Sequence, residues 1–163
     1  MEKFESEIST LDYMTEDVIK LSVGCPESFT FKAGQYIMFT FTKGEERKAR
    51  AYSILSAPSQ KEQLDFAIKI VEGGFASECF KELHVGSMIP VKGPLGHFVF
   101  REESMSSKVC FIGTGTGVAP FYSMIKEWAP KMPEKKFHLI FGVRHKKGVF
   151  LHEEVEEWAR DWS

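Results

Sequence analysis

A short apolar run followed at once by glycines is the feature that most restricts what this chain can fold into. Residues 109–112 read Val-Cys-Phe-Ile, and residues 113–120 read Gly-Thr-Gly-Thr-Gly-Val-Ala-Pro. A continuous apolar run is typical of a strand buried on both faces of a parallel sheet. A helix is expected from about 119 to 128, because proline is well tolerated in a first helical turn. The segment therefore predicts a strand, a glycine loop and a helix, in that order.

The glycine loop is a candidate phosphate-binding site. Backbone N–H groups at a helix N-terminus, together with the helix dipole, favour a phosphate group. The loop is not a Walker A sequence, and Val118 replaces the third glycine of the pattern GxGxxG, so the segment reads Gly115-x-Gly117-x-x-Pro120. The alternative is that the glycines only allow the strand and the helix to pack closely. The residues alone leave both interpretations open.

The chain after this loop predicts the opening of a doubly wound α/β fold. Residues 137–143 form a second apolar strand, and a final amphipathic helix has one apolar face made of Leu151, Val155, Trp158 and Trp162. Two strands are too few to bury both helices, so Trp158 and Trp162 are expected to be exposed. Cys110 is expected to be buried as a small apolar residue.

The first hundred residues have a different pattern, with short alternating runs separated by turn residues. Strands are expected at 18–23, 36–41, 50–55, 64–71, 87–92 and 97–100, with one helix at 75–83. This pattern predicts a small antiparallel barrel of Greek-key type, closed or nearly closed, over about residues 5–101. The polar stretch 101–108 separates the two parts. The fold class is therefore β plus α/β, with a barrel domain at 1–103 and an incomplete α/β domain at 104–163.

The segment Arg50-Ala-Tyr-Ser53 places Arg50 and Tyr52 on one face of a strand. A guanidinium group suits phosphate oxygens, and a phenol offers an aromatic plane and a hydroxyl. A flat heterocycle joined to a phosphate would contact both side chains. The alternative is an edge strand with a solvated Arg50 beside a half-buried Tyr52.

A second pair of glycines precedes the predicted helix at 75–83. The segment Gly73-Gly-Phe-Ala-Ser77 offers a Ser hydroxyl and free N–H donors in the first helical turn. It is either a second phosphate site or simply a helix start capped by the serine.

Composition argues against several classes of function. The net charge of −2 gives no reason to expect nucleic acid as a partner, and no window approaches the length of a membrane span. The three cysteines form no CxxC pair and the histidines have no ligand spacing, so neither a metal site nor a disulfide framework is expected. A reducing cytoplasm is the simplest location.

Taken in order, these segments resemble the ferredoxin–NADP reductase-like flavoprotein family. The resemblance covers essentially the whole chain and rests on Phe31-x-x-Gly34-Gln35-Tyr36, Arg50-x-Tyr52-Ser53, Ser56-x-Pro58, Gly74-x-x-Ser77, Gly93-Pro-x-Gly96, Gly115-x-Gly117-x-x-Pro120 and Gly142-x-Arg144. It implies a barrel that holds FAD, in preference to FMN, and an α/β domain that binds NAD(P)H. It also implies electron transfer to ferredoxin, flavodoxin or an oxygenase partner.

The resemblance implies roles for individual residues. Arg50 would pair with the flavin pyrophosphate. Tyr52 would pack against the flavin with its hydroxyl at the ribityl chain, and Ser53 would lie near flavin N5, which makes these two the candidate catalytic residues.

The remaining implied contacts bind the two cofactors. Those to FAD are Gly74, Phe75, Ala76 and Ser77 at the pyrophosphate, and Ile68, Lys69 and Ile70 along the adenine side. Those to the nicotinamide dinucleotide are Gly113, Thr114, Gly115, Thr116, Gly117 and Pro120, with Arg144 near its ribose and phosphate region.

The chain departs from the family in length. Members usually continue well past the position of Ser163, with a Cys-Gly segment beside the nicotinamide and residues that select NADPH or NADH. A fragment of a longer reductase is therefore expected. The alternatives are a flavin-binding electron-transfer subunit that does not itself oxidise NAD(P)H, and an interaction domain with no cofactor. The choice between FAD and FMN, the preference for NADH or NADPH, the electron acceptor and the oligomeric state stay open.

Overall fold

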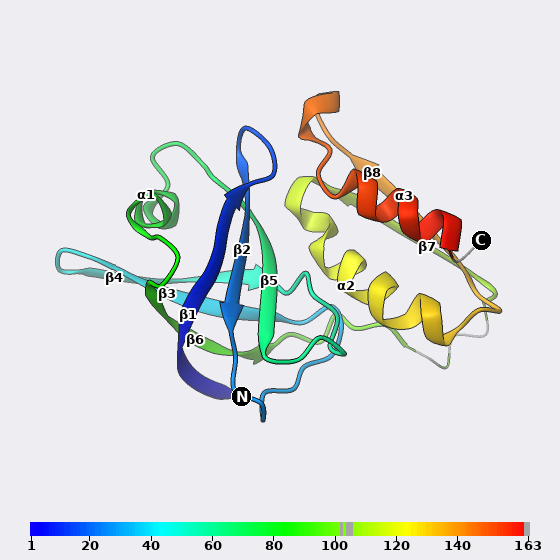
Figure 1. The fold of residues 1–163 in the computed structure, drawn as a ribbon, viewed down its shortest axis with the longest axis horizontal. Helices are drawn as coiled ribbons and strands as arrows, with labels where there is room; N and C mark the ends of the chain where they lie inside the picture. The colour runs from blue at the N-terminus through cyan, green and yellow to red at the C-terminus, as the bar shows by residue number, and fades with distance from the viewer. Residues whose placement is uncertain (102, 104–105, 162–163) are drawn as a thin grey trace.

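The computed structural model describes residues 1–101, 103 and 106–161, and these residues form two lobes (Figure 1). The first lobe is a six-stranded antiparallel sheet with the strand order β4-β3-β6-β1-β2-β5. Its strands are β1 (Glu2–Tyr13), β2 (Val18–Gly24), β3 (Tyr36–Lys43), β4 (Glu46–Ser53), β5 (Gln63–Lys69) and β6 (Met88–Leu95).

The sheet is curled so that its two edge strands approach each other. Just beyond β4, the Leu55 N–H donates to the Asp65 carbonyl of β5 at 2.7 Å. Helix α1 (Phe75–Glu82) covers one opening of the curled sheet, where Phe80 meets Phe41 of β3 at 5.0 Å between ring centroids. The prediction of a nearly closed antiparallel barrel is confirmed.

Two features of this lobe differ from the sequence prediction. Strand β1 was not predicted, because its buried face carries the polar Ser6 beside Ile8 and therefore does not read as an apolar alternation. Residues 97–100 were predicted as a strand but belong to no ladder. Strand β6 instead continues to Leu95, through the first part of the predicted turn at 93–96.

The second lobe has the predicted order of strand, glycine loop and helix. Strands β7 (Lys108–Thr114) and β8 (Lys136–Gly142) are parallel, with Thr114 opposite Gly142. Between them lie the 3₁₀ turn η1 (Gly115–Val118), helix α2 (Ala119–Trp128) and the short turn η2 (Ala129–Lys131). The 3₁₀ turn η3 (Lys146–Gly148) and helix α3 (His152–Asp161) follow β8.

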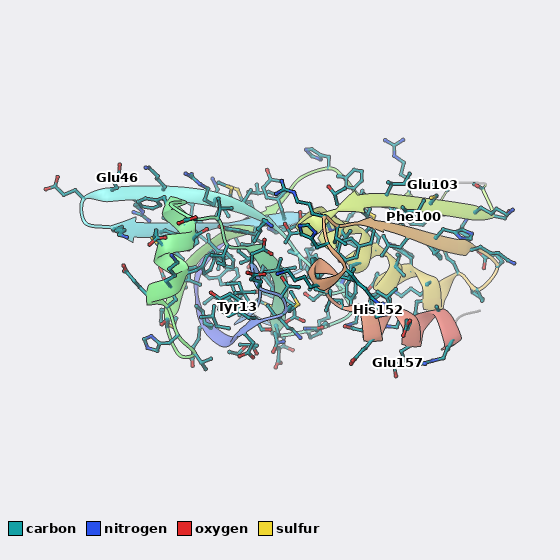
Figure 2. All side chains as sticks on the ribbon, turned by 90° about the horizontal axis from the view of Figure 1, so that it is seen from above. Tyr13, Glu46, Phe100, Glu103, His152 and Glu157 are labelled. Atoms are coloured by element: carbon teal, nitrogen blue, oxygen red, sulfur yellow. The ribbon has the colours of Figure 1, made fainter. Side chains whose placement is uncertain are left out.

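Strand β7 is buried on one face only, so the prediction of burial on both faces is wrong. Figure 2 shows α2 and α3 on the same side of the β7–β8 sheet. Phe111 faces the helices and is buried, whereas Ile112 and Ile140 on the opposite face are 67% and 55% exposed. Cys110 shares that face and is exposed, not buried as predicted. A local apolar run cannot tell whether a second layer covers the strand.

The predicted exposure of Trp158 is also wrong. Trp158 of α3 is half-buried, and its ring lies 4.4 Å from that of Tyr122 on α2, measured between centroids. The two helices thus bury each other's apolar faces. Trp162, for which the same exposure was expected, lies outside the described residues.

The two lobes share an apolar boundary and buried polar contacts. Val18 and Leu55 of the first lobe belong to one buried cluster with Tyr122 and Phe150 of the second. The Ser123 hydroxyl donates to the Ser56 carbonyl at 2.7 Å in the buried boundary. Helix α2 is therefore fixed against the barrel.

In the part of the chain that the structure describes, no helix has the length and apolar character needed to cross a membrane.

Candidate cofactor site

Strand β4 lies at the edge of the sheet, beside the start of helix α1. The Lys48 ammonium lies 4.5 Å from the centroid of the Phe75 ring, which joins β4 to the first turn of α1. Arg50 is exposed, and its guanidinium donates to the carbonyl of the adjacent Ala49 at 3.0 Å. β4 is thus an edge strand, as the alternative interpretation held. The Arg50 guanidinium is therefore exposed to solvent, where an external anion is able to reach it.

Tyr52 is half-buried in an aromatic cluster. Its ring centroid lies 5.5 Å from that of Phe39 and 5.9 Å from that of Phe80. Burial raises the pKa of Tyr52 to about 12, although the positive charge of Arg50 acts in the opposite direction. The Tyr52 hydroxyl therefore stays protonated at neutral pH, where it is able to donate a hydrogen bond. Ser53 is half-buried at the end of β4, opposite Tyr36.

The serine at the start of α1 does not cap the helix. Gly74 occupies the N-cap position without a side-chain hydrogen bond. The Ser77 hydroxyl instead accepts a hydrogen bond from the Val71 N–H at 2.9 Å and so holds the preceding loop, in which Gly73 has a φ of +69°. The first N–H groups of a helix have no acceptor within the helix. The first N–H groups of α1 are therefore available to an acceptor from outside the helix.

The three residues predicted along the adenine side differ in what they expose. Ile68 is buried in the barrel core and lies opposite Ile19 in the β2–β5 ladder. The Ile70 N–H donates to the Asp17 carbonyl at 2.7 Å. The Lys69 side chain is exposed and forms an ion pair with the Asp17 carboxylate. Of the three, Lys69 alone presents a charged group.

The glycines of the loop after β7 have different roles. A Cβ atom at Gly113 would lie 3.0 Å from Val118 and 3.1 Å from Phe121, so this glycine serves close packing. A Cβ atom at Gly115 or Gly117 would meet no heavy atom within 4 Å. Close packing therefore explains why position 113 is a glycine, but it does not explain the glycine at position 117. The space beside Gly115 and Gly117 is open, and Pro120 stands in the first turn of α2 as predicted.

A cleft of about 680 Å³ lies between the two lobes beside this loop. Because β7 and β8 are parallel, their carboxyl ends meet and bring Arg144 to the glycine loop. Of the predicted site residues, the cleft lining includes Lys69, Thr114, Gly115, Thr116 and Arg144. Arg50, Tyr52, Ser53 and the first turn of α1 are not in this lining.

The opposite wall of the cleft comes from the barrel and was missed by the sequence analysis. It is formed by Thr15, Glu16 and Asp17, in the connection between β1 and β2. Glu16 pairs with Lys147 of η3 across the cleft. No sequence motif marks these residues, since their role depends on how the two lobes meet.

No group of three or more His, Cys, Asp or Glu side chains among the described residues is placed to hold a metal ion.

Comparison with protein families matches both lobes. Residues 6–100 match the oxidoreductase FAD-binding domain, and residues 111–162 match the oxidoreductase NAD-binding domain. These matches confirm FAD and the nicotinamide dinucleotide as the cofactors of the two lobes.

Curated relatives of the chain are reductases. It is 31% identical to the ferredoxin–NAD(P)(+) reductase component of the naphthalene 1,2-dioxygenase/salicylate 5-hydroxylase systems of Ralstonia sp., over 93% of this chain and 45% of that protein. It is also 31% identical to ferredoxin–NADP reductase B of Sorangium cellulosum, over 98% of this chain and 66% of that protein. The chain spans about half the length of several curated relatives that it matches.

Solved structures share the fold. The Amycolatopsis cytochrome P450 reductase GcoB superposes with a TM-score of 0.89 at 24% identity, over 98% of this chain and 48% of that one. A ferredoxin NADP+ reductase from Neisseria gonorrhoeae superposes with a TM-score of 0.88 at 23% identity, over 99% of this chain and 65% of that one. The predicted fold class, a barrel followed by an incomplete α/β domain, is confirmed.

Proposed function

Because the chain belongs to the oxidoreductase FAD-binding domain family and carries an oxidoreductase NAD-binding domain after it, we propose that it passes electrons from NAD(P)H through FAD to an acceptor. A ferredoxin, a flavodoxin or an oxygenase component is the proposed acceptor. This choice is supported by relatives named as reductase components of dioxygenase systems and of a propane 2-monooxygenase.

The observation that carries the proposal is the cleft between the lobes. One wall is a glycine loop with open space at Gly115 and Gly117, next to Arg144. The other wall belongs to the lobe that matches FAD-binding domains and includes Lys69. A dinucleotide on the glycine loop would thus lie against the lobe that matches FAD-binding domains, on the side that carries Lys69.

The site residues keep their proposed roles in this reaction. A bound flavin supplies the redox chemistry, and the protein supplies position and charge. Arg50 neutralises the flavin pyrophosphate together with the backbone of Gly74, Phe75, Ala76 and Ser77. Tyr52 donates its hydroxyl proton in a hydrogen bond, which its raised pKa preserves.

The remaining proposed roles follow the same division between the lobes. The Ser53 hydroxyl hydrogen-bonds near flavin N5, and Ile68, Lys69 and Ile70 lie along the adenine side. The nicotinamide dinucleotide is held by Gly113, Thr114, Gly115, Thr116, Gly117, Pro120 and Arg144.

An anaerobic titration tests the proposal. The chain is loaded with FAD, and NADPH or NADH is added while the visible absorbance of the flavin is recorded. Bleaching of the flavin band, at a rate above that of free FAD, is expected. A chain that binds FAD but leaves its absorbance unchanged with either coenzyme would contradict reductase activity at this length.

A second function is favoured by the bare face of the β7–β8 sheet. Ile112 and Ile140 are more than half exposed on that face. This exposure suits a flavin-binding electron-transfer module that does not itself oxidise NAD(P)H. Flavin that stays bound but is reduced only by a chemical reductant would identify this function.

Two further assignments accompany the proposal. The domain boundary is placed between residues 103 and 104, which falls in the interval between the two family matches at 6–100 and 111–162. A cytoplasmic location is proposed because Cys25, Cys79 and Cys110 are all free, as suits a reducing compartment.

A further inference from the structure

One ion pair crosses the cleft between the lobes. Glu16, in the β1–β2 connection, receives a hydrogen bond from the Lys147 ammonium of η3, although the two residues are 131 positions apart. The next residue, Asp17, pairs with Lys69 of its own lobe. Two neighbouring carboxylates thus hold two different lysines, and Glu16 reaches the opposite wall.

The pair between Glu16 and Lys147 is held loosely enough for a ligand to displace it. The two side chains are 76% and 71% exposed, and exposed ion pairs contribute little stability. The hydrogen bond and the charge of Lys147 lower the pKa of Glu16, and His145 adds a smaller effect of the same sign. Glu16 is therefore a carboxylate at neutral pH, and an anion in the cleft would compete with it for Lys147.

The position of Lys147 indicates which anion would compete with Glu16 for its ammonium group. In doubly wound folds the residues after the second strand contact the adenine ribose. An acidic residue there binds the 2′-hydroxyl, whereas an arginine accommodates a 2′-phosphate. The residues after β8 read Val143-Arg-His-Lys-Lys147 and contain no acid. The negative charge facing this basic segment comes from the other lobe, from Glu16.

We propose that Glu16 is a specificity-determining residue of the coenzyme site: its carboxylate competes with the ribose 2′-phosphate of NADP(H) for Lys147 and so weakens the preference for the phosphorylated coenzyme. This inference rests on the proposed function, because it takes the cleft to be the NAD(P)H site. It assigns a coenzyme-selecting role to the barrel, which carries no part of the dinucleotide loop.

Binding measured by calorimetry tests the role of Glu16 without any activity. NADP⁺ and NAD⁺ are titrated into the wild-type chain and into the variants Glu16→Gln and Lys147→Gln. For Glu16→Gln we expect NADP⁺ to bind about two- to fivefold more tightly, with NAD⁺ changed less than about twofold, given the small energy of an exposed pair. Lys147→Gln should weaken the binding of NADP⁺ more than the binding of NAD⁺. Both differences should shrink at high salt, because exposed charges are screened.

A matched control separates competition from a general change in charge. Glu45→Gln removes the same charge at the exposed tip of the β3–β4 hairpin, where the neighbouring Glu46 lies far from α3 (Figure 2). It should leave both affinities unchanged. Equal tightening by Glu45→Gln and Glu16→Gln, or equal tightening of NAD⁺ and NADP⁺, would overturn the inference.

The remaining outcomes distinguish the inference from the proposed function. If the wild-type chain binds both coenzymes and Glu16→Gln changes neither, the inference alone fails. If the wild-type chain and Glu16→Gln bind neither coenzyme, the inference and the coenzyme site of the proposed function fail together.

Discussion

Arg50 is exposed on an edge strand, so its side chain contributes little to the stability of the fold. We expect it to contribute much more to the binding of the FAD pyrophosphate. We expect Arg50→Ala to weaken FAD binding about tenfold or more, because a hydrogen bond to a charged group is worth about 1.5–3 kcal/mol. Quenching of FAD fluorescence during titration measures the change. The melting temperature without FAD should stay within a degree or two of the wild type.

Arg50→Lys is the matched control. It keeps the charge but loses the planar fork that binds two phosphate oxygens at once. An affinity between those of the wild type and Arg50→Ala is expected. Equal FAD affinity in all three proteins would remove Arg50 from the site.

The raised pKa of Tyr52 predicts a loss of stability in alkali. Its folded pKa of about 12 lies above the ordinary value of 10.0, so the folded state keeps the proton longer than the unfolded state. This contribution to the free energy of unfolding is complete below pH 10 and is lost as the pH rises through 12. Urea titrations at several alkaline pH values should show a steeper loss for the wild type than for Tyr52→Phe. Equal slopes would show that Tyr52 titrates normally.

At the scale of single elements, Gly34 allows the segment before β3 to lie close to the backbone of Phe98, in the stretch of chain that joins the two lobes. It has a φ of +100°, and a Cβ atom there would lie 2.1 Å from the Phe98 carbonyl oxygen. We expect Gly34→Ala to reduce the free energy of unfolding by about 3 kcal/mol, because a backbone atom cannot give way as a side chain does. Chemical denaturation measures the change.

Gly44 in the β3–β4 turn supplies the control for Gly34. Its φ is +58°, but a Cβ atom there would meet no heavy atom within 4 Å. Gly44→Ala should therefore cost only the backbone strain, about 1–2 kcal/mol. Equal losses in the two variants would mean that backbone strain, and not the clash, dominates at Gly34.

The elements that local chemistry specifies were the ones that the sequence predicted well. Helix α2 begins at Ala119 and ends at Trp128 as expected, since Pro120 and the preceding glycines are local signals. Strand β1 was missed because Ser6 on its buried face interrupts the apolar pattern. The exposure of Cys110 and Ile112 was missed because it depends on what covers the strand, not on the strand's own residues.

At the scale of the whole molecule, Glu127 of α2 anchors the second lobe to the first. The residue is only 8% exposed, and its carboxylate accepts a hydrogen bond from the Ser59 N–H at 2.9 Å and another from Lys131. Burial opposes ionisation, but hydrogen bonds from Lys131 and Ser59 outweigh it and lower the pKa of Glu127. The charged carboxylate thus stabilises the joined lobes.

Glu127→Gln should reduce the free energy of unfolding by about 1–3 kcal/mol at neutral pH, because hydrogen bonds between charged groups are lost. The wild-type contribution is complete above the ordinary carboxyl pKa of 4.5 and disappears as the pH falls through the lower folded value. The two proteins should therefore converge in stability on acidification, as followed by thermal melting. A constant difference down to strong acid would contradict this.

The interface between the lobes also limited what the sequence revealed about the site. Seven motifs pointed to residues on both lobes, and the structure brings Lys69 of the barrel and Arg144 of the second lobe into one cleft. Glu16 and Lys147 belong to no motif. Their pairing required the complete arrangement of both lobes.

The pairing of Glu16 with Lys147 also has a consequence for the order in which parts of the molecule fold. Contacts between residues far apart in sequence carry a large entropic cost of loop closure and tend to form late in folding. The cleft needs residues 131 positions apart to meet, so it is completed only when nearly the whole chain has collapsed. Nucleotide binding would then report on the last stage of folding, and a ligand that binds the finished cleft would pull the two lobes toward their joined state by mass action.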